Sequence, residues 1–152
     1  MRAREARWAE IDLVSKVWTI PANRMKSGRE HRVPLSERAI ELLGIPGDDT
    51  DFVFPGQVYR KPFSRGACAA VLKNLRPEAT IHGFRSSFRD WAAEMVTVQR
   101  EVVEQCLAHT VGNMVELAYW RGDILEKRRA LMQKWADFIE PHVGMNNVVN
   151  LR

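Results

Sequence analysis

The sequence IHGFRSSFRDWAAEM, residues 81–95, is the most informative stretch of the chain for the fold. Its apolar residues recur at alternating intervals of three and four, which is the spacing of one face of an α-helix. That face comprises Ile81, Phe84, Phe88, Trp91 and Met95. We therefore predict a helix here that buries this face against other helices.

Helical patterns continue on both sides of this stretch. Residues 64–75 form a predicted helix that ends before Pro77, because the residue before a proline is disfavoured in the helical conformation. Short helices are expected around residues 102–107 and from 111 towards 118, and a long helix from 123 towards Pro141. Apolar residues of the long helix repeat at helical spacing, at Leu125, Met132, Trp135 and Ile139.

The N-terminal third has the features of strands instead. Trp8, Ile11 and Leu13 approach the alternation of a half-buried strand, and residues 17–20, VWTI, are strongly β-prone. The polar, basic stretch 23–30 then forms a long turn, from which the chain returns as a strand at 31–35. This order predicts an antiparallel hairpin or a three-stranded sheet.

Ser36 is a predicted N-cap for a short helix that runs through Leu43. The complete pattern predicts an α+β fold, in which a small antiparallel β-sheet is followed by a mainly α-helical bundle. With 152 residues, a single domain is expected. We assign residues 1–35 to its sheet part, 36–140 to its helical part and 141–152 to a C-terminal tail.

Composition argues against several classes of protein. No apolar run approaches the ~20 residues that span a bilayer, and the N-terminus lacks the apolar core of a secretory signal, so we expect no membrane association. Cys68 and Cys106 lie far apart without the spacing of metal ligands, and we predict two reduced thiols in a cytoplasmic protein. A formal net charge of +4 weakly favours a polyanionic partner.

Three polar residues share one stripe of the helix predicted at 81–95. His82, Arg85 and Arg89 follow one another at i, i+3 and i+7. An imidazole beside a guanidinium suits a phosphate group, because the guanidinium is a planar double donor and the imidazole can donate or carry a proton. A solvated helix face with an N-terminal histidine has the same pattern, so this stripe alone leaves both interpretations open.

Three further residues also have ordinary explanations when each is taken alone. His109 can be a surface histidine, Tyr119 a packed tyrosine and Lys26 a solvated turn lysine. Their order is more specific: Lys26 in the basic turn, HGFR at 82–85, LAHT at 107–110 and AYWRGD at 118–123. This combination resembles the tyrosine recombinases, and among them the phage and genomic-island integrases. The resemblance extends from about Trp8 to Pro141.

The resemblance implies a role for each matching residue. Tyr119 would attack a scissile DNA phosphate and form a 3′-phosphotyrosyl bond, with release of a 5′-hydroxyl. Arg85 would stabilise the charge that grows on the non-bridging oxygens. His82 and His109 would bind the phosphate and assist proton transfer, and Lys26 would protonate the leaving 5′-oxygen. The resemblance also implies that the reaction uses no metal and no other cofactor.

Two features differ from the family pattern. The family has a further catalytic arginine in an RxxE motif, whose position relative to Trp8 falls before Met1, and Arg2 is only a weak substitute. Ala108 stands where the family usually has glycine before the second histidine. We therefore expect an incomplete integrase catalytic domain with impaired DNA cleavage. The alternative is a non-catalytic DNA-binding remnant of an integrase; a type IB topoisomerase shares the chemistry, but the flanking sequence is more similar to integrases.

The resemblance also predicts partners and location. Double-stranded DNA is the expected substrate, and the full-length family acts as a homotetramer on DNA. We expect this chain alone to be a monomer that does not bind membranes. A protein with this function would lie in the bacterial cytoplasm, associated with the nucleoid.

Overall fold

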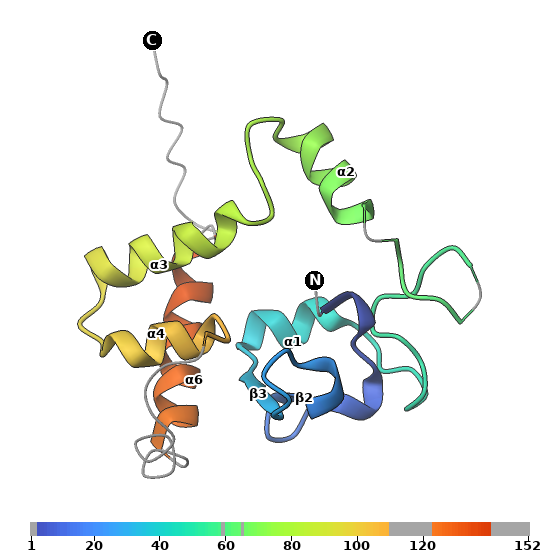
Figure 1. Ribbon diagram of the computed structural model, residues 1–152, viewed down its shortest axis with the longest axis horizontal. Helices are drawn as coiled ribbons and strands as arrows, with labels where there is room; N and C mark the ends of the chain where they lie inside the picture. The colour runs from blue at the N-terminus through green and yellow to red at the C-terminus, as the bar shows by residue number, and fades with distance from the viewer. Residues whose placement is uncertain (1–2, 59, 65, 110–122, 141–152) are drawn as a thin grey trace.

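The computed structural model describes residues 3–58, 60–64, 66–109 and 123–140. In these ranges the chain forms a small sheet with helix α1 next to it, and a bundle of helices α3, α4 and α6 (Figure 1). Helix α2 stands apart from both groups. The α+β fold predicted from the sequence is confirmed.

The sheet has three antiparallel strands in the order β1-β2-β3: Ile11–Asp12, Val17–Ile20 and His31–Pro34. Trp18 pairs with both Ile11 and Val33, so β2 is the central strand. The prediction that Trp8 and Leu13 continue the first strand is wrong. Trp8 begins the short 3₁₀-helix η2, Trp8–Glu10, and the Asp12 carboxylate accepts the backbone N–H groups of Val14 and Ser15, which turns the chain immediately after β1.

The long turn between β2 and β3 is confirmed. It contains the 3₁₀-helix η3, Ala22–Arg24, and then Gly28, whose φ of 63° is a conformation that glycine adopts without strain. After β3, Ser36 caps helix α1, Glu37–Leu43, by accepting a hydrogen bond from Ala39 N at 3.2 Å. The predicted cap is therefore correct, and Gly44, with a φ of 76°, ends the helix.

Helices α3 (Gly83–Met95), α4 (Arg100–Cys106) and α6 (Asp123–Ile139) enclose the main apolar core. Phe88 and Trp91 are buried there, and Phe88 contacts the ring of Trp135 edge-on at a centroid distance of 5.6 Å. The predicted burial of Phe84 and Met95 is wrong, since their exposed fractions are 56% and 67%. These two residues lie in the first and last turns of α3, whereas the buried core residues of this helix come from its middle.

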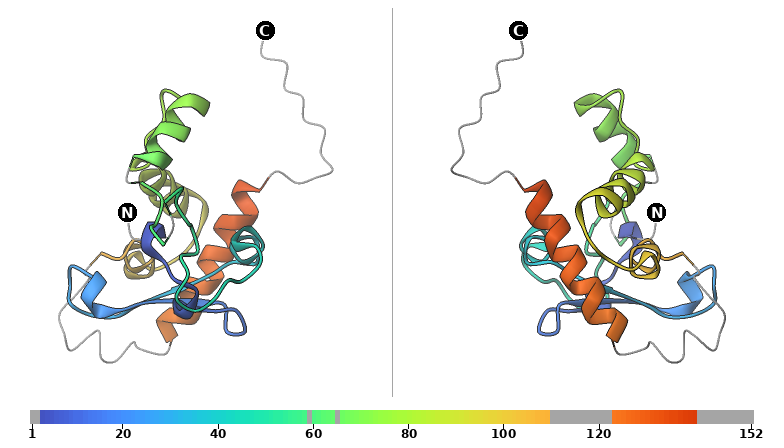
Figure 2. Two further views of the ribbon diagram at one scale, coloured as in Figure 1. Left: turned by 90° about the vertical axis from the view of Figure 1, so that its right-hand side faces the viewer. Right: turned by 90° about the vertical axis from the view of Figure 1, so that its left-hand side faces the viewer.

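Helix α6 joins the two groups of elements, because it packs against β3 and α1 as well as α4 (Figure 2). The long helix and its bounds were predicted correctly, but its buried face was not. Ile124, Arg128 and Leu131 are buried, whereas Ile139 is exposed and Leu125, Met132 and Trp135 are half-buried. A search for apolar spacing misses this face because a charged residue, Arg128, occupies its middle.

Helix α2, Ala67–Leu75, begins three residues after the predicted start at 64, and none of its residues is buried. The predicted helix at 111–118 and the tail at 141–152 lie outside the described residues. No helix in the described ranges has the length and apolar character needed to cross a membrane.

Candidate active site

Arg85 and His109, far apart in sequence, meet at the end of α4. Arg85 extends from the first turn of α3, and its Nη2 donates a hydrogen bond to the carbonyl oxygen of Leu107 at 2.5 Å. The same Nη2 lies 2.8 Å from Nε2 of His109. The structure thus brings together two of the residues that the sequence proposed for phosphate binding.

The backbone at the end of α4 determines where His109 lies. Ala108 adopts a left-handed conformation with a φ of 54°. The N–H of His109 donates to the carbonyl of Glu104 at 2.9 Å, and that of Ala108 donates to the carbonyl of Gln105 at 3.0 Å. These two bonds form a Schellman motif, which closes the helix and returns His109 over its last turn.

Glu104 is a member of this cluster that the sequence analysis missed. Only 8% of the residue is exposed. Its Oε2 lies 2.5 Å from Nδ1 of His109, and its Oε1 forms an ion pair with Nη2 of Arg89 at 2.9 Å. The available signal was a carboxylate directly after Val102 and Val103, in a segment predicted to be a short helix.

The environment of Glu104 favours its charged form. The hydrogen bond with His109 lowers the pKa of the Glu104 carboxyl below its ordinary value, and the positive charge of Arg89 acts in the same direction. Burial opposes both effects without cancelling them. Glu104 therefore carries a negative charge between two potential cations.

The other predicted site residues are less connected. His82 lies at the N-terminal boundary of α3, where Thr80 Oγ1 accepts the N–H of Gly83 at 2.9 Å, and its side chain is exposed. Lys26 is exposed in the turn between β2 and β3. Neither residue forms a hydrogen bond with Arg85 in the described part of the chain. Tyr119 and Arg2 lie outside the described residues.

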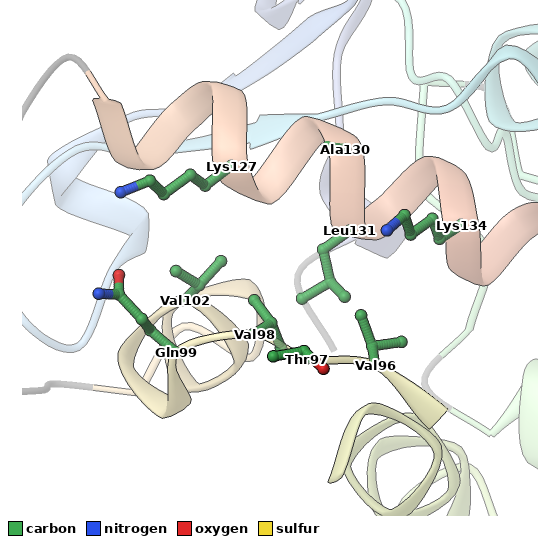
Figure 3. A pocket seen from close by; sticks show the side chains of 9 residues that line it. All are labelled: Val96, Thr97, Val98, Gln99, Val102, Lys127, Ala130, Leu131 and Lys134. Carbon is green, nitrogen blue, oxygen red and sulfur yellow. The ribbon is translucent and has the colours of Figure 1, made fainter. Parts of the chain in front are cut away.

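A separate cavity of about 310 Å³ lies between residues 96–102 and α6 (Figure 3). Val102 and Leu131 are among its apolar walls, and Lys127 and Lys134 contribute its basic groups. None of the predicted site residues that the structure describes lines this cavity. In the same described ranges, no group of three or more His, Cys, Asp or Glu side chains is placed to hold a metal ion.

Comparison with known families identifies the chain. Residues 1–123 match the model of the phage integrase family. The chain belongs to the phage integrase family. This confirms the resemblance that was drawn from the motifs around Lys26, Arg85, His109 and Tyr119.

Several curated integrases are similar to most of this chain. Prophage integrase IntA of Escherichia coli K12 is 39% identical over 91% of this chain, and the integrase of Shigella phage Sf6 is 34% identical over 92% of it. The integrase of Enterobacteria phage P4 is 33% identical over 97% of this chain. The chain spans 35% to 38% of the length of these three relatives. No solved structure gives a significant match.

Ala108 is the position at which the resemblance led us to expect glycine, and the backbone conformation there would suit glycine. Ala108 occupies that position here with a φ of 54°, and a Cβ atom makes this conformation unfavourable. Ala108 therefore holds this cap conformation at a cost of about 1–2 kcal/mol.

Proposed function

We propose that this chain carries the catalytic part of an integrase that performs site-specific DNA recombination through a 3′-phosphotyrosine intermediate. The observation that carries the proposal is the contact between Arg85 and His109 at 2.8 Å. Two cationic or proton-carrying groups from separate motifs converge there, as the binding of one scissile phosphate requires.

In this mechanism the phenolic oxygen of Tyr119 attacks the phosphorus of the scissile phosphate. A bond from phosphorus to the tyrosine oxygen forms and the bond to the 5′-oxygen breaks, so the phosphate ester is exchanged and not hydrolysed. Lys26 gives a proton to the leaving 5′-oxygen, because an alkoxide would otherwise be a poor leaving group. Attack by another 5′-hydroxyl on the phosphotyrosine then rejoins the strands.

Arg85 supplies the electrostatic part of catalysis. Its guanidinium presents several N–H donors in one plane, which match the non-bridging oxygens of a phosphate. His82 lies one helical turn before Arg85 and reaches the same phosphate in this proposal. The reaction needs no metal or nucleotide cofactor, since these cations neutralise the phosphate and the phosphotyrosine conserves the energy of the broken bond.

The proposed partners follow from this chemistry. Double-stranded DNA is the substrate, and the complete integrase assembles as a homotetramer on it, whereas this chain is a monomer in the absence of DNA. Residues 1–35, 36–140 and 141–152 act as the sheet, helical and tail parts of one catalytic domain. Integration of DNA into a bacterial chromosome places the protein in the cytoplasm at the nucleoid.

The second candidate is a non-catalytic DNA-binding remnant of an integrase, whereas the leading proposal allows impaired cleavage. The described arginines near the N-terminus contact other residues of the same chain. Arg4 forms an ion pair with Glu5 and donates to the carbonyl of Phe63 at 3.2 Å. Arg7 stacks on the ring of Phe52, with its guanidinium carbon 4.2 Å from the ring centroid. Both arginines are therefore held by structural contacts within the described residues, and neither is assigned a catalytic role.

A nicked duplex that traps cleaved DNA separates the two candidates. When cleavage releases a short strand that diffuses away, the phosphotyrosine cannot be reversed and a covalent protein–DNA complex accumulates. Such a complex with the wild-type chain, absent with Tyr119→Phe but with unchanged DNA affinity, supports the integrase. DNA binding by both proteins without any covalent complex supports the remnant.

A further inference from the structure

The buried carboxylate of Glu104 contacts the ring nitrogen of His109 that faces away from Arg85. Oε2 of Glu104 lies 2.5 Å from Nδ1, and Nη2 of Arg85 lies 2.8 Å from Nε2. Both ring nitrogens are thus engaged, one by an acceptor and the other by a donor. No role for Glu104 follows from the motifs that identified Lys26, His82, Arg85, His109 and Tyr119.

These two contacts decide where the imidazole proton lies. A guanidinium nitrogen can only donate a hydrogen bond, so Nε2 of His109 must accept one through its lone pair. The proton of the neutral ring is then on Nδ1, where it is donated to the Glu104 carboxylate. A histidine with its proton on Nε2 would place that N–H against Arg85 and leave Nδ1 facing a carboxylate with no proton between them.

Glu104 is itself held in place. Its other oxygen, Oε1, pairs with Nη2 of Arg89 at 2.9 Å, and Arg89 lies one turn after Arg85 on the same helix. The backbone contributes too, because the carbonyl of Glu104 accepts the N–H of His109. Side chain and main chain of one residue therefore orient the same histidine.

We propose that Glu104 is a positioning residue that keeps the proton of His109 on Nδ1, so that Nε2 presents a lone pair towards the phosphate bound by Arg85. This inference rests on the proposed function. It makes His109 a proton acceptor on entering the reaction. When Arg85 turns from Nε2 to the phosphate, that nitrogen can take the proton that Tyr119 loses as its oxygen bonds to phosphorus.

The direct test is the protonation of the His109 ring in the intact chain, measured by long-range ¹H–¹⁵N NMR at a pH where the ring is neutral. Comparison with His109→Gln assigns the signals. We expect the proton on Nδ1 in the wild type and a mixture of both forms in Glu104→Gln. A wild-type ring with its proton on Nε2 overturns the proposal without any variant at Glu104.

The matched control is Glu101→Gln, which removes a carboxylate from the first turn of the same helix, where the side chain is exposed. We expect it to leave the His109 signals unchanged. An equal effect of Glu101→Gln and Glu104→Gln would assign the change to the general field of the helix and would contradict a specific role for Glu104.

Trapping of the covalent complex provides the functional arm. We expect Glu104→Gln to slow its formation by about 10–100-fold, by analogy with removal of the carboxylate that orients a metal-binding histidine. In the His109→Gln background the same substitution should have no further effect, because Glu104 acts through His109. If Glu104→Gln slows formation of the complex equally in the wild-type and His109→Gln backgrounds, the proposal is overturned. A wild-type chain that forms no complex contradicts the proposed function instead, and the NMR result still decides the role of Glu104.

Discussion

Ala108 is the residue at which backbone conformation and side chain conflict most clearly. Its φ of 54° is reached more easily by glycine, so Ala108→Gly should raise the free energy of unfolding by about 1 kcal/mol. Urea unfolding followed by circular dichroism measures this. Ala93→Gly, at an exposed position inside α3, is the control and should lower stability by about 1 kcal/mol. A loss of stability in Ala108→Gly would mean that the cap does not need this conformation.

Glu104 is a second single residue that affects stability, because its lowered pKa makes the free energy of unfolding depend on pH. Its pKa lies below the ordinary value of 4.5 in the folded chain, so the folded state binds fewer protons at this carboxyl than the unfolded state does. The resulting stabilisation is present above 4.5 and is lost as the pH falls through the lowered pKa. The stability gap between the wild type and Glu104→Gln should therefore narrow as the solution is acidified. Thermal unfolding of both proteins at several pH values measures this difference in stability. If the difference is the same at every pH, the ion pairs assigned to Glu104 are contradicted.

Helix α6 is the element on which the packing of the whole chain depends. Leu131, 2% exposed, contacts the core formed with α3 and α4, so Leu131→Ala should cost about 2–5 kcal/mol. Leu75→Ala is the matched control, because Leu75 of α2 is 70% exposed and should change stability by less than about 0.5 kcal/mol. Chemical unfolding of both variants tests this, and similar losses would mean that α6 is not the centre of the core.

At the element scale, the sequence predicted the parts whose patterns are local. The turn at 23–30, the Ser36 cap and the bounds of α6 depend on residues close in sequence, and all are found. The face that a helix buries depends on its neighbours instead. Phe84 and Met95 fit the apolar stripe of α3 but lie at its ends, and Arg128 is buried between β3 and α4, which no periodicity reveals.

In the candidate site too, local sequence motifs were predictable and contacts between distant elements were not. Motif order was sufficient to select Arg85 and His109, whose contact the structure reveals. Glu104 was missed because its partner His109 follows the end of α4, so the contact depends on the left-handed turn at Ala108 rather than on helical spacing. The positions of Tyr119 relative to these residues, and the roles of His82 and Lys26, stay predictions.

For the whole molecule, a net charge of +4 and the proposed phosphate-binding residues predict DNA affinity that falls steeply with salt. Each lost phosphate contact reduces the slope of log K against log salt by about 0.9. Arg85→Gln should therefore lower the slope by about one, measured by fluorescence anisotropy on a duplex. Lys134→Gln, at the cavity of Figure 3, should leave it unchanged. Equal slopes for the wild type and Arg85→Gln would remove Arg85 from the DNA interface.

The central claim is that Tyr119 becomes covalently bound to DNA, and peptide mapping of the trapped complex tests it most directly. The chain has two tyrosines, Tyr59 and Tyr119, so the assignment is unambiguous. After digestion with protease and nuclease, mass spectrometry should find the nucleotide remnant on the peptide that contains Tyr119, and Tyr59→Phe should still form the complex. A remnant on Tyr59, or a covalent complex that persists in Tyr119→Phe, would contradict the account.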